Sequence, residues 1–234
     1  IREAQRARLP ASLPGTEGSP AIDIALGALR AYYDLGARYM TLTHNSHTDW
    51  ADSAMPDTPK SGGLSPFGER VVGEMNRLGM LVDLSHTAAD TMRDALDVSK
   101  APVIFSHAAA RALVDIPRNV PDDVIARLPA NGGVLMVTFV AGFVSQDAAN
   151  TLFPVMKEFY QSAGSAKTDE ERRAAYEKLK NIKLPPVTVK DVADHIEHVV
   201  KVASIDNVGI GGDFDGNDQW PEGLSDVSMY PNLF

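Results

Sequence analysis

Short apolar runs alternate with amphipathic stretches along most of the chain. Most of these runs are aliphatic and end next to a polar residue. They span Arg38–Thr43, Met80–Ser85, Ala101–Ser106, Gly133–Phe139 and Asn207–Gly212. Continuous runs of this length are typical of parallel strands that are buried on both faces. We therefore expect five strands, with a sixth, weaker strand at Ala11–Thr16.

Between these runs, apolar residues recur with the spacing of an α-helix. The expected helices are Ile24–Leu35, Pro66–Leu78, Thr87–Asp97, Val189–Ala203 and a shorter one at Pro121–Leu128. Strand and helix alternate, which indicates βαβ units. Polar residues follow at least four of the strands, and a TIM-type (β/α)8 barrel gathers such strand ends at one mouth. We therefore predict an α/β fold of this type, incomplete because fewer than eight strands are visible.

The length of the chain suits one large domain. It has 234 residues, of which 44% are hydrophobic, and this is enough for one sizeable core. The stretch Gln161–Pro186 differs from the rest because it is rich in Lys, Glu and Ala. We expect a single partial barrel domain over residues 1–234, with a charged helical insertion at about 161–186.

Composition excludes several classes of function. The net charge of −9 argues against a nucleic-acid partner, which would need a basic face. Without cysteine, the chain has no disulfides, thiol nucleophiles or Cys-ligated zinc. No segment is long and apolar enough for a membrane span, and no signal peptide is visible at Ile1.

Three histidines occupy the same position in the pattern, immediately after a predicted strand. They are His44, His86 and His107. One such histidine is more often a packed core residue than a ligand. The ends of parallel barrel strands converge, however, and imidazole is the commonest metal ligand. Together, the three histidines predict a metal site.

The other histidines are weaker candidates. His195 and His198 form an H-x-x-H pair on the predicted helix Val189–Ala203, where His198 points well away from the apolar stripe and His195 lies on its flank. We interpret both as part of a solvated helix face. His47 lies in a polar loop, and two interpretations stay open for it: lining a site or facing water.

Polar residues near other strand ends could complete a site. Asp213 and Asp215 lie in a glycine-rich turn after the last strand, where an aspartate can act as general acid or base beside a metal. The alternative is a tight turn with structural aspartates. Glu17 alone reads as a surface residue. For Arg118, binding of a substrate carboxylate and a surface position are equally open.

Six phrases of the sequence occur in an order that is specific to one family. They are LTHNSHTDWAD, GLSPFG, MLVDLSH, APVIFSH, RNVPDD and GGDFDG. Together they closely resemble the renal, or membrane, dipeptidase family from about Glu17 to the end of the chain. The resemblance implies a binuclear zinc hydrolase on a TIM barrel that cleaves dipeptides, in some members with a D-residue at the C-terminal position.

The resemblance also implies roles for individual residues. Glu17 matches the carboxylate that bridges the two zinc ions, and His86 and His107 match the histidines of the second zinc. Asp213 matches the acid/base aspartate and His44 the histidine that polarises the scissile carbonyl. Two further residues are implied to bind the substrate. Arg118 matches the arginine that grips the substrate carboxylate, and Phe143 stands at the position of a residue that lines the substrate pocket.

The sequence departs from the family pattern in two places. The family's other zinc relies on a His-x-Asp pair upstream of the bridging glutamate, and neither residue type precedes Glu17. The chain therefore resembles a segment that lacks the first strands and the C-terminal tail of the family. The family also has a tyrosine where Phe143 stands here.

The expected activity is zinc-dependent hydrolysis of a small dipeptide by a hydroxide that bridges two zinc ions. A lactonase or β-lactam hydrolase on the same barrel is the enzymatic alternative, and an inactive ligand-binding relative is the other if the chain is naturally short. A homodimer is compatible with the resemblance. Family resemblance also slightly favours a periplasmic or secreted location.

Overall fold

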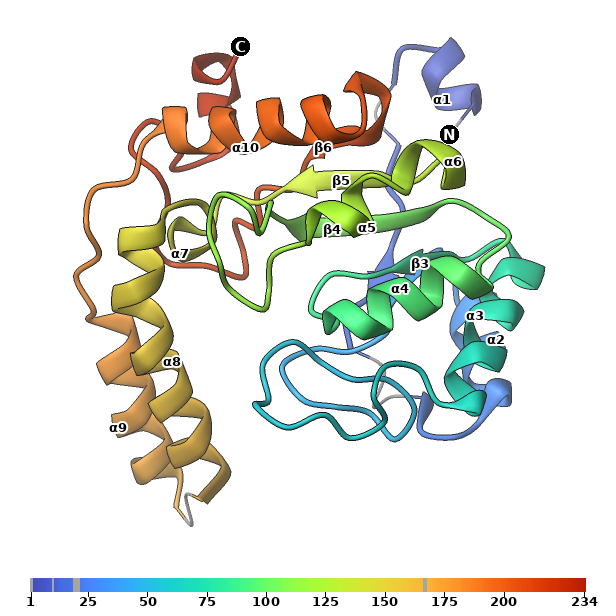
Figure 1. Ribbon diagram of the computed structural model, residues 1–234, viewed down its shortest axis with the longest axis horizontal. Coiled ribbons are helices and arrows are strands. Elements are labelled where there is room, and N and C mark those ends of the chain that lie inside the picture. Colours follow the sequence, from blue (N-terminus) through green and yellow to red (C-terminus); the bar gives the residue numbers. More distant parts are fainter. Residues whose placement is uncertain (1, 10, 19–21, 166–167) are drawn as a thin grey trace. The chain divides into compact units, whose positions relative to one another are not determined.

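The computed structural model describes residues 2–9, 11–18, 22–165 and 168–234 of the chain (Figure 1). Its strands are β1 (Gly15–Thr16), β2 (Tyr39–Thr41), β3 (Leu81–Asp83), β4 (Val103–Ala108), β5 (Val134–Val137) and β6 (Val208–Ile210). All six coincide with runs that the sequence predicts as strands. One detail differs: β4 begins two residues later than expected and continues through Ala108, so that His107 lies within the strand rather than after it.

The helices follow the predicted alternation. They are α1 (Arg2–Arg6), α2 (Leu26–Asp34), α3 (Pro66–Leu78), α4 (Ala89–Val98), α5 (Asp122–Ile125), α6 (Leu128–Asn131), α7 (Ala141–Val144), α8 (Gln146–Ser165), α9 (Asp169–Lys180) and α10 (Val189–Val202), with 3-10 turns at Ile205–Asn207 and Val227–Asn232. The sequence pattern did not indicate α7 or α8. Within the described residues, no helix is long and apolar enough to cross a membrane.

The limits of α3 show how local chemistry sets an element. The Ser65 hydroxyl accepts the backbone N–H of Gly68 at 3.3 Å, which caps the start of the helix. Pro66 follows at the first helical position, where its missing N–H has no cost. Gly79 ends the helix with φ 78°, a left-handed conformation that glycine adopts without strain. The predicted bounds of this helix are therefore confirmed.

The strands form a parallel sheet whose spatial order is the chain order, β1 to β6. The register pairs Gly15 with Tyr39, and Tyr39 in turn with Leu81. At the other end, Leu135 pairs with Val208. A doubly wound sheet reverses its strand order at a switch point, whereas a (β/α) barrel adds each strand beside the previous one. The order therefore confirms the TIM-type fold, with six strands among the described residues.

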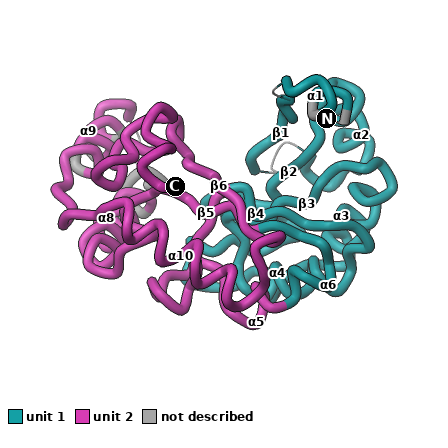
Figure 2. The backbone as a smooth tube through the Cα atoms, turned by 90° about the horizontal axis from the view of Figure 1, so that it is seen from above, with its two compact units in different colours: residues 1–106, 127–134 teal, residues 107–126, 135–234 magenta. Residues whose placement is uncertain are grey.

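The chain divides into two compact units (Figure 2). The first comprises residues 1–106 and 127–134, and in it α3 packs against α2, α4 and β3. The second comprises residues 107–126 and 135–234. There α10 packs against β6, α5 and α7, while α8 and α9 lie side by side as a hairpin (Figure 1). The hairpin helix α9 falls within the stretch that the sequence marks as a charged insertion.

Candidate metal centre

A buried carboxylate joins three neighbouring strands, two of which lead to the candidate ligands His86 and His107. Asp83, the last residue of β3, is fully buried. Its Oδ2 accepts the hydroxyls of Thr41 on β2 at 2.9 Å and of Ser106 on β4 at 2.5 Å. Its Oδ1 accepts the backbone N–H groups of Ser106 at 3.0 Å and Ser85 at 3.1 Å. Four donors offset the cost of burying the charge. Asp83 thereby fixes the ends of β2, β3 and β4 against one another.

His86 follows this platform in an unusual backbone conformation. Its φ is 66°, which is uncommon for a residue with a side chain. The strained backbone is held at its carbonyl oxygen, which accepts the N–H of Ala54 at 2.8 Å and the hydroxyl of Thr43 at 3.1 Å. Strain of this kind persists where the surroundings over-determine it and often marks a functional position. Here it sets the direction in which the His86 imidazole leaves the chain.

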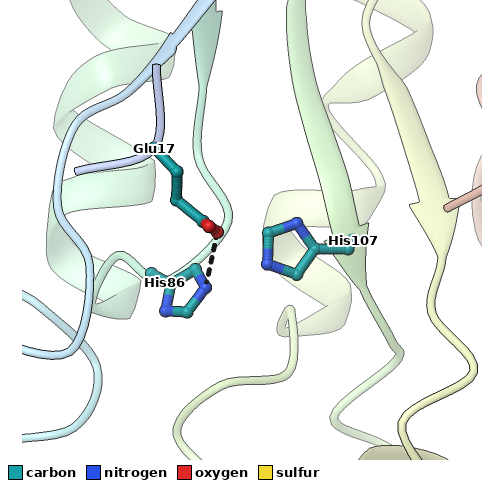
Figure 3. A group of neighbouring side chains, drawn as sticks. All are labelled: Glu17, His86 and His107. Carbon is teal, nitrogen blue, oxygen red and sulfur yellow. Dashed lines mark ion pairs between the residues drawn. The ribbon is translucent and has the colours of Figure 1, made fainter. Parts of the chain in front are cut away.

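The side chains of Glu17, His86 and His107 come together (Figure 3). Each offers one ligand atom, and these atoms all lie within 4.8 Å of one another. Glu17 follows β1 directly and its side chain is 48% exposed, while that of His86 is 8% exposed. The His86 Nε2 lies 3.1 Å from the Glu17 Oε1. The carboxylate and imidazoles point toward one another from the ends of β1, β3 and β4.

This donor set fits a zinc ion. Zn²⁺ takes imidazole nitrogen and carboxylate oxygen, whereas Ca²⁺ and Mg²⁺ prefer oxygen ligands alone. The local electrostatics also favour a cation. The pKa of the Tyr39 phenol is raised by burial first, and then by the negative charges of Asp83 and Glu17. The same two carboxylates that disfavour a phenolate would attract a metal ion.

His44 lies beside this group. Its ring centroid is 4.4 Å from that of His86, with the two ring planes tilted by 47°. The residue is exposed, and its backbone carbonyl accepts the Ser53 hydroxyl at 2.5 Å. The structure therefore brings four of the sequence-predicted residues to one place: His44, Glu17, His86 and His107.

Arg118 and Phe143 form a second pair, within the second compact unit. Arg118 is 1% exposed, so its interpretation as a surface arginine is wrong. Its guanidinium carbon lies 5.0 Å from the centroid of the Phe143 ring, within range of a cation–π interaction. Phe143 lies on α7, and its carbonyl accepts the side-chain amide of Asn119 at 2.9 Å. Burial raises the pKa of the nearby Tyr160 phenol, against an opposing effect of the Arg118 charge.

Asp213 occupies a tight turn after β6. Its φ of 56° is again left-handed, and its carbonyl accepts the Gly216 N–H at 3.3 Å. A side chain at Gly216 would meet the Asp213 carboxylate, since an added Cβ would lie 2.4 Å from Oδ1. Phe214 stacks on Tyr230 and contacts Phe139 edge to face. The tight turn predicted from the sequence is therefore confirmed, and the role of the half-buried Asp213 as general acid or base stays a prediction.

His195 and His198 do not form a solvated face. His195 is 1% exposed, and its Nδ1 accepts the backbone N–H of Ala110, just past β4, at 3.0 Å. Burial lowers the pKa of His195 to about 4, against a hydrogen bond with the Val144 backbone. The apolar pattern predicted Val192 and Val199 on the buried face of α10 correctly, but it wrongly left His195 outside that face. His198 is half-buried, with its Nε2 2.8 Å from the Asp122 carboxylate on α5.

His47 has a structural role in the loop between β2 and α3. Its Nδ1 accepts the Ser53 N–H at 3.0 Å, and its Nε2 lies 2.9 Å from the carbonyl oxygen of Thr58. The adjacent Asp52 carboxylate, which the sequence did not single out, accepts the backbone N–H groups of residues 60–63 at 2.7–3.1 Å. Both side chains hold the loop that follows His44.

A parallel sheet in chain order, with two imidazoles and a carboxylate at its strand ends, defines a protein of the TIM-barrel type with a candidate metal centre. The family model for membrane dipeptidases (peptidase family M19) matches residues 1–234. The chain therefore belongs to this family, as the sequence phrases implied.

Individual relatives agree. Two uncharacterized dipeptidases of Schizosaccharomyces pombe are 44% identical over 225 residues and 42% identical over 224 residues. These matches cover 94% and 95% of this chain but 45% and 46% of the relatives. The chain thus spans about half the length of the curated relatives it matches.

Solved structures show the same fold. The probable dipeptidase PvdM of Pseudomonas aeruginosa is 27% identical, with a TM-score of 0.81 over 99% of this chain and 64% of that one. A metallo peptidase of Rhodobacter sphaeroides, liganded with a phosphinate mimic of the dipeptide L-Ala-D-Ala, is 26% identical. Its TM-score is 0.76 over 99% of this chain and 57% of that one.

Proposed function

We propose that the protein to which this chain belongs is a zinc-dependent dipeptidase. The observation that carries the proposal is the group of Glu17, His86 and His107, whose ligand atoms lie within 4.8 Å of one another in a chain of the M19 family. The relative that binds a mimic of L-Ala-D-Ala supports a substrate class that includes dipeptides with a C-terminal D-residue.

Glu17, His86 and His107 would hold zinc, and two ions would occupy the complete site. Bound zinc supplies a water of lowered pKa as nucleophile and polarises the scissile carbonyl. The chain's own contribution is to place the two imidazoles before the metal arrives. The Asp83 hydrogen bonds and the fixed carbonyl of His86 serve this placement.

The remaining residues act on the substrate. The buried Arg118 guanidinium, backed by the Phe143 ring, binds the free carboxylate of the dipeptide, and its planar fork suits that group. His44 donates a hydrogen bond to the scissile carbonyl as negative charge develops there. Asp213 takes a proton from the attacking water and delivers it to the amine that leaves when the peptide bond breaks. Binding of both the free carboxylate and the free amine of the substrate would limit it to two residues.

Three further assignments belong to this proposal. Residues 1–234 are part of one catalytic barrel domain with the α9 region as an insertion. The protein acts outside the cytoplasm. It forms a homodimer, which sedimentation of the full-length protein would test.

The test uses the full-length protein and two histidine variants. His86→Ala should lose about one zinc per chain and most hydrolysis of Gly-D-Ala and Gly-L-Ala. His198→Ala is the matched control, because that imidazole contacts Asp122 and lies on another element. It should keep both metal and activity. Wild-type turnover by metal-depleted His86→Ala protein would refute the assignment, and faster opening of a lactone or carbapenem than of any dipeptide would favour the other hydrolase class.

A further inference from the structure

One amide side chain connects the candidate metal ligand to its histidine neighbour. Asn45 lies directly after His44 in the chain and is half-buried. Its Oδ1 is 3.1 Å from the His86 Nδ1. Its Nδ2 is 3.4 Å from the His44 Nε2. A single amide group therefore faces one ring nitrogen of each histidine.

The chemistry of the two amide ends fixes the state of both rings. An amide oxygen only accepts, so the His86 Nδ1 must carry the proton in this contact. In neutral imidazole the Nε2 then has a free lone pair, and this is the nitrogen that faces Glu17 at 3.1 Å. The amide N–H donates to the His44 Nε2, which leaves the N–H of that ring at Nδ1.

The placement of His86 makes this contact important. Its backbone is already held by two donors to its carbonyl, so the direction in which the side chain leaves the chain is set and the rotation of the ring remains to be fixed. A flipped ring would present a C–H toward Glu17, and the other tautomer would present an N–H there, and neither can bind a metal. Partners that hold the second nitrogen of a ligating histidine commonly change metal affinity by 10- to 100-fold.

We propose that Asn45 is a positioning residue with two separable roles. Its amide oxygen holds the His86 imidazole in the metal-binding tautomer, and its amide N–H orients the His44 ring for contact with the substrate. This inference rests on the proposed function, since it assumes that His86 binds zinc and that His44 acts on the scissile carbonyl.

Two substitutions separate these roles in the full-length protein. Asn45→Asp keeps an acceptor for His86 but has no N–H for His44, while Asn45→Leu removes both. Exposed Ser46, the next residue along, provides the control Ser46→Leu. Zinc affinity is measured by chelator competition, and Co²⁺ absorption spectra report the ligand geometry. The values of kcat and KM for a dipeptide are then measured at saturating zinc, with circular dichroism as the check of folding.

Asn45→Leu should weaken zinc binding by about 10- to 100-fold. Asn45→Asp should bind zinc at least as tightly as the wild type, yet its kcat should fall by about tenfold, the effect of one hydrogen bond, with little change in KM. Ser46→Leu should change neither quantity. If Asn45→Leu fails to fold, Asn45→Ala replaces it.

Each part of the inference has its own refutation. Wild-type zinc affinity in folded Asn45→Leu or Asn45→Ala, or zinc loss in Asn45→Asp equal to theirs, would overturn the role toward His86. Wild-type kcat in Asn45→Asp would overturn the role toward His44. Wild-type protein that binds no zinc, or hydrolyses no dipeptide, would instead refute the proposed function itself.

Discussion

Replacing His195 should remove a source of acid instability. This histidine is 1% exposed and accepts a backbone N–H from Ala110, so it is neutral in the folded protein. Burial lowers its pKa from the ordinary 6.5 to about 4. The charged groups around it are His198, Asp194 and Asp191, and their effects are smaller than that of burial. Between the two pKa values, the unfolded chain binds a proton that the folded chain does not. Stability therefore rises with pH across this window and is lost as the pH falls through it.

The size of the effect follows from the two pKa values. A difference of about 2.5, at 1.36 kcal/mol for each pKa unit, gives a total loss of about 3 kcal/mol below pH 4. About 2 kcal/mol of this is lost between pH 7 and pH 5, where measurement is practical. His195→Asn does not titrate, and it retains an oxygen near the position of Nδ1 for the Ala110 N–H. The variant should be less stable at pH 7, because it packs less well, but should lose about 2 kcal/mol less on acidification.

Urea unfolding of the full-length protein at pH 7 and pH 5 measures this difference. Loss of metal at pH 5 affects the wild type and the variant alike and cancels in the comparison. His198→Asn serves as the control and should retain the wild-type pH dependence that arises from His195. An equal loss of stability in His195→Asn and the wild type would refute the reasoning, because the acid instability would then come from other groups.

Substitutions at three further places, Asp83, Asp52 and α3, test the framework around the site. Asp83→Ala leaves two buried backbone N–H groups without their acceptor and should destabilise the protein by about 2–6 kcal/mol in urea unfolding. Asp83→Asn should destabilise it less, because the hydroxyls of Thr41 and Ser106 can turn to accept hydrogen bonds from the amide. Burial tends to raise the pKa of Asp52, but hydrogen bonds from the backbone of residues 60–63 outweigh burial and lower the pKa. The stability that this carboxylate contributes is therefore present above its ordinary pKa of 3.8 and is lost as the pH falls through the lowered pKa. Asp52→Ala should therefore increase proteolysis of the loop at neutral pH, and unchanged cleavage would contradict this. Gly68→Ala places a Cβ 2.4 Å from the backbone oxygen of Trp50 and should lower the free energy of unfolding by about 1–3 kcal/mol. Gly73→Ala on the same helix meets no atom within 4 Å and should raise the free energy of unfolding by about 0.5–1 kcal/mol. Equal effects of the two substitutions would show that the clash at Gly68 is relieved.

The sequence predicted the elements well where one physical signal dominates. The run Met80–Ser85 could only be a buried strand, and Ser65-Pro66 with Gly79 marks both ends of α3. It failed where signals conflict. Pro154 lies inside α8, although proline normally argues against a helix interior. In α10, His195 was placed on the solvent side because the prediction takes only apolar residues as buried. A polar residue at a core position is therefore assigned to the wrong face.

The site divides in the same way. Ligand candidates can be found from sequence because strand ends in a parallel sheet converge, so a histidine after each of two strands is informative without knowledge of contacts. The residues that hold the ligands give no such signal. Asn45 is 41 positions from His86, and Asp83 is 23 positions from Ser106, so these pairs exist only through the register of the sheet and the path of a long loop. In the sequence, nothing distinguishes Asn45 from other asparagines in loops. Its two contacts with His44 and His86 make it testable as part of the metal centre.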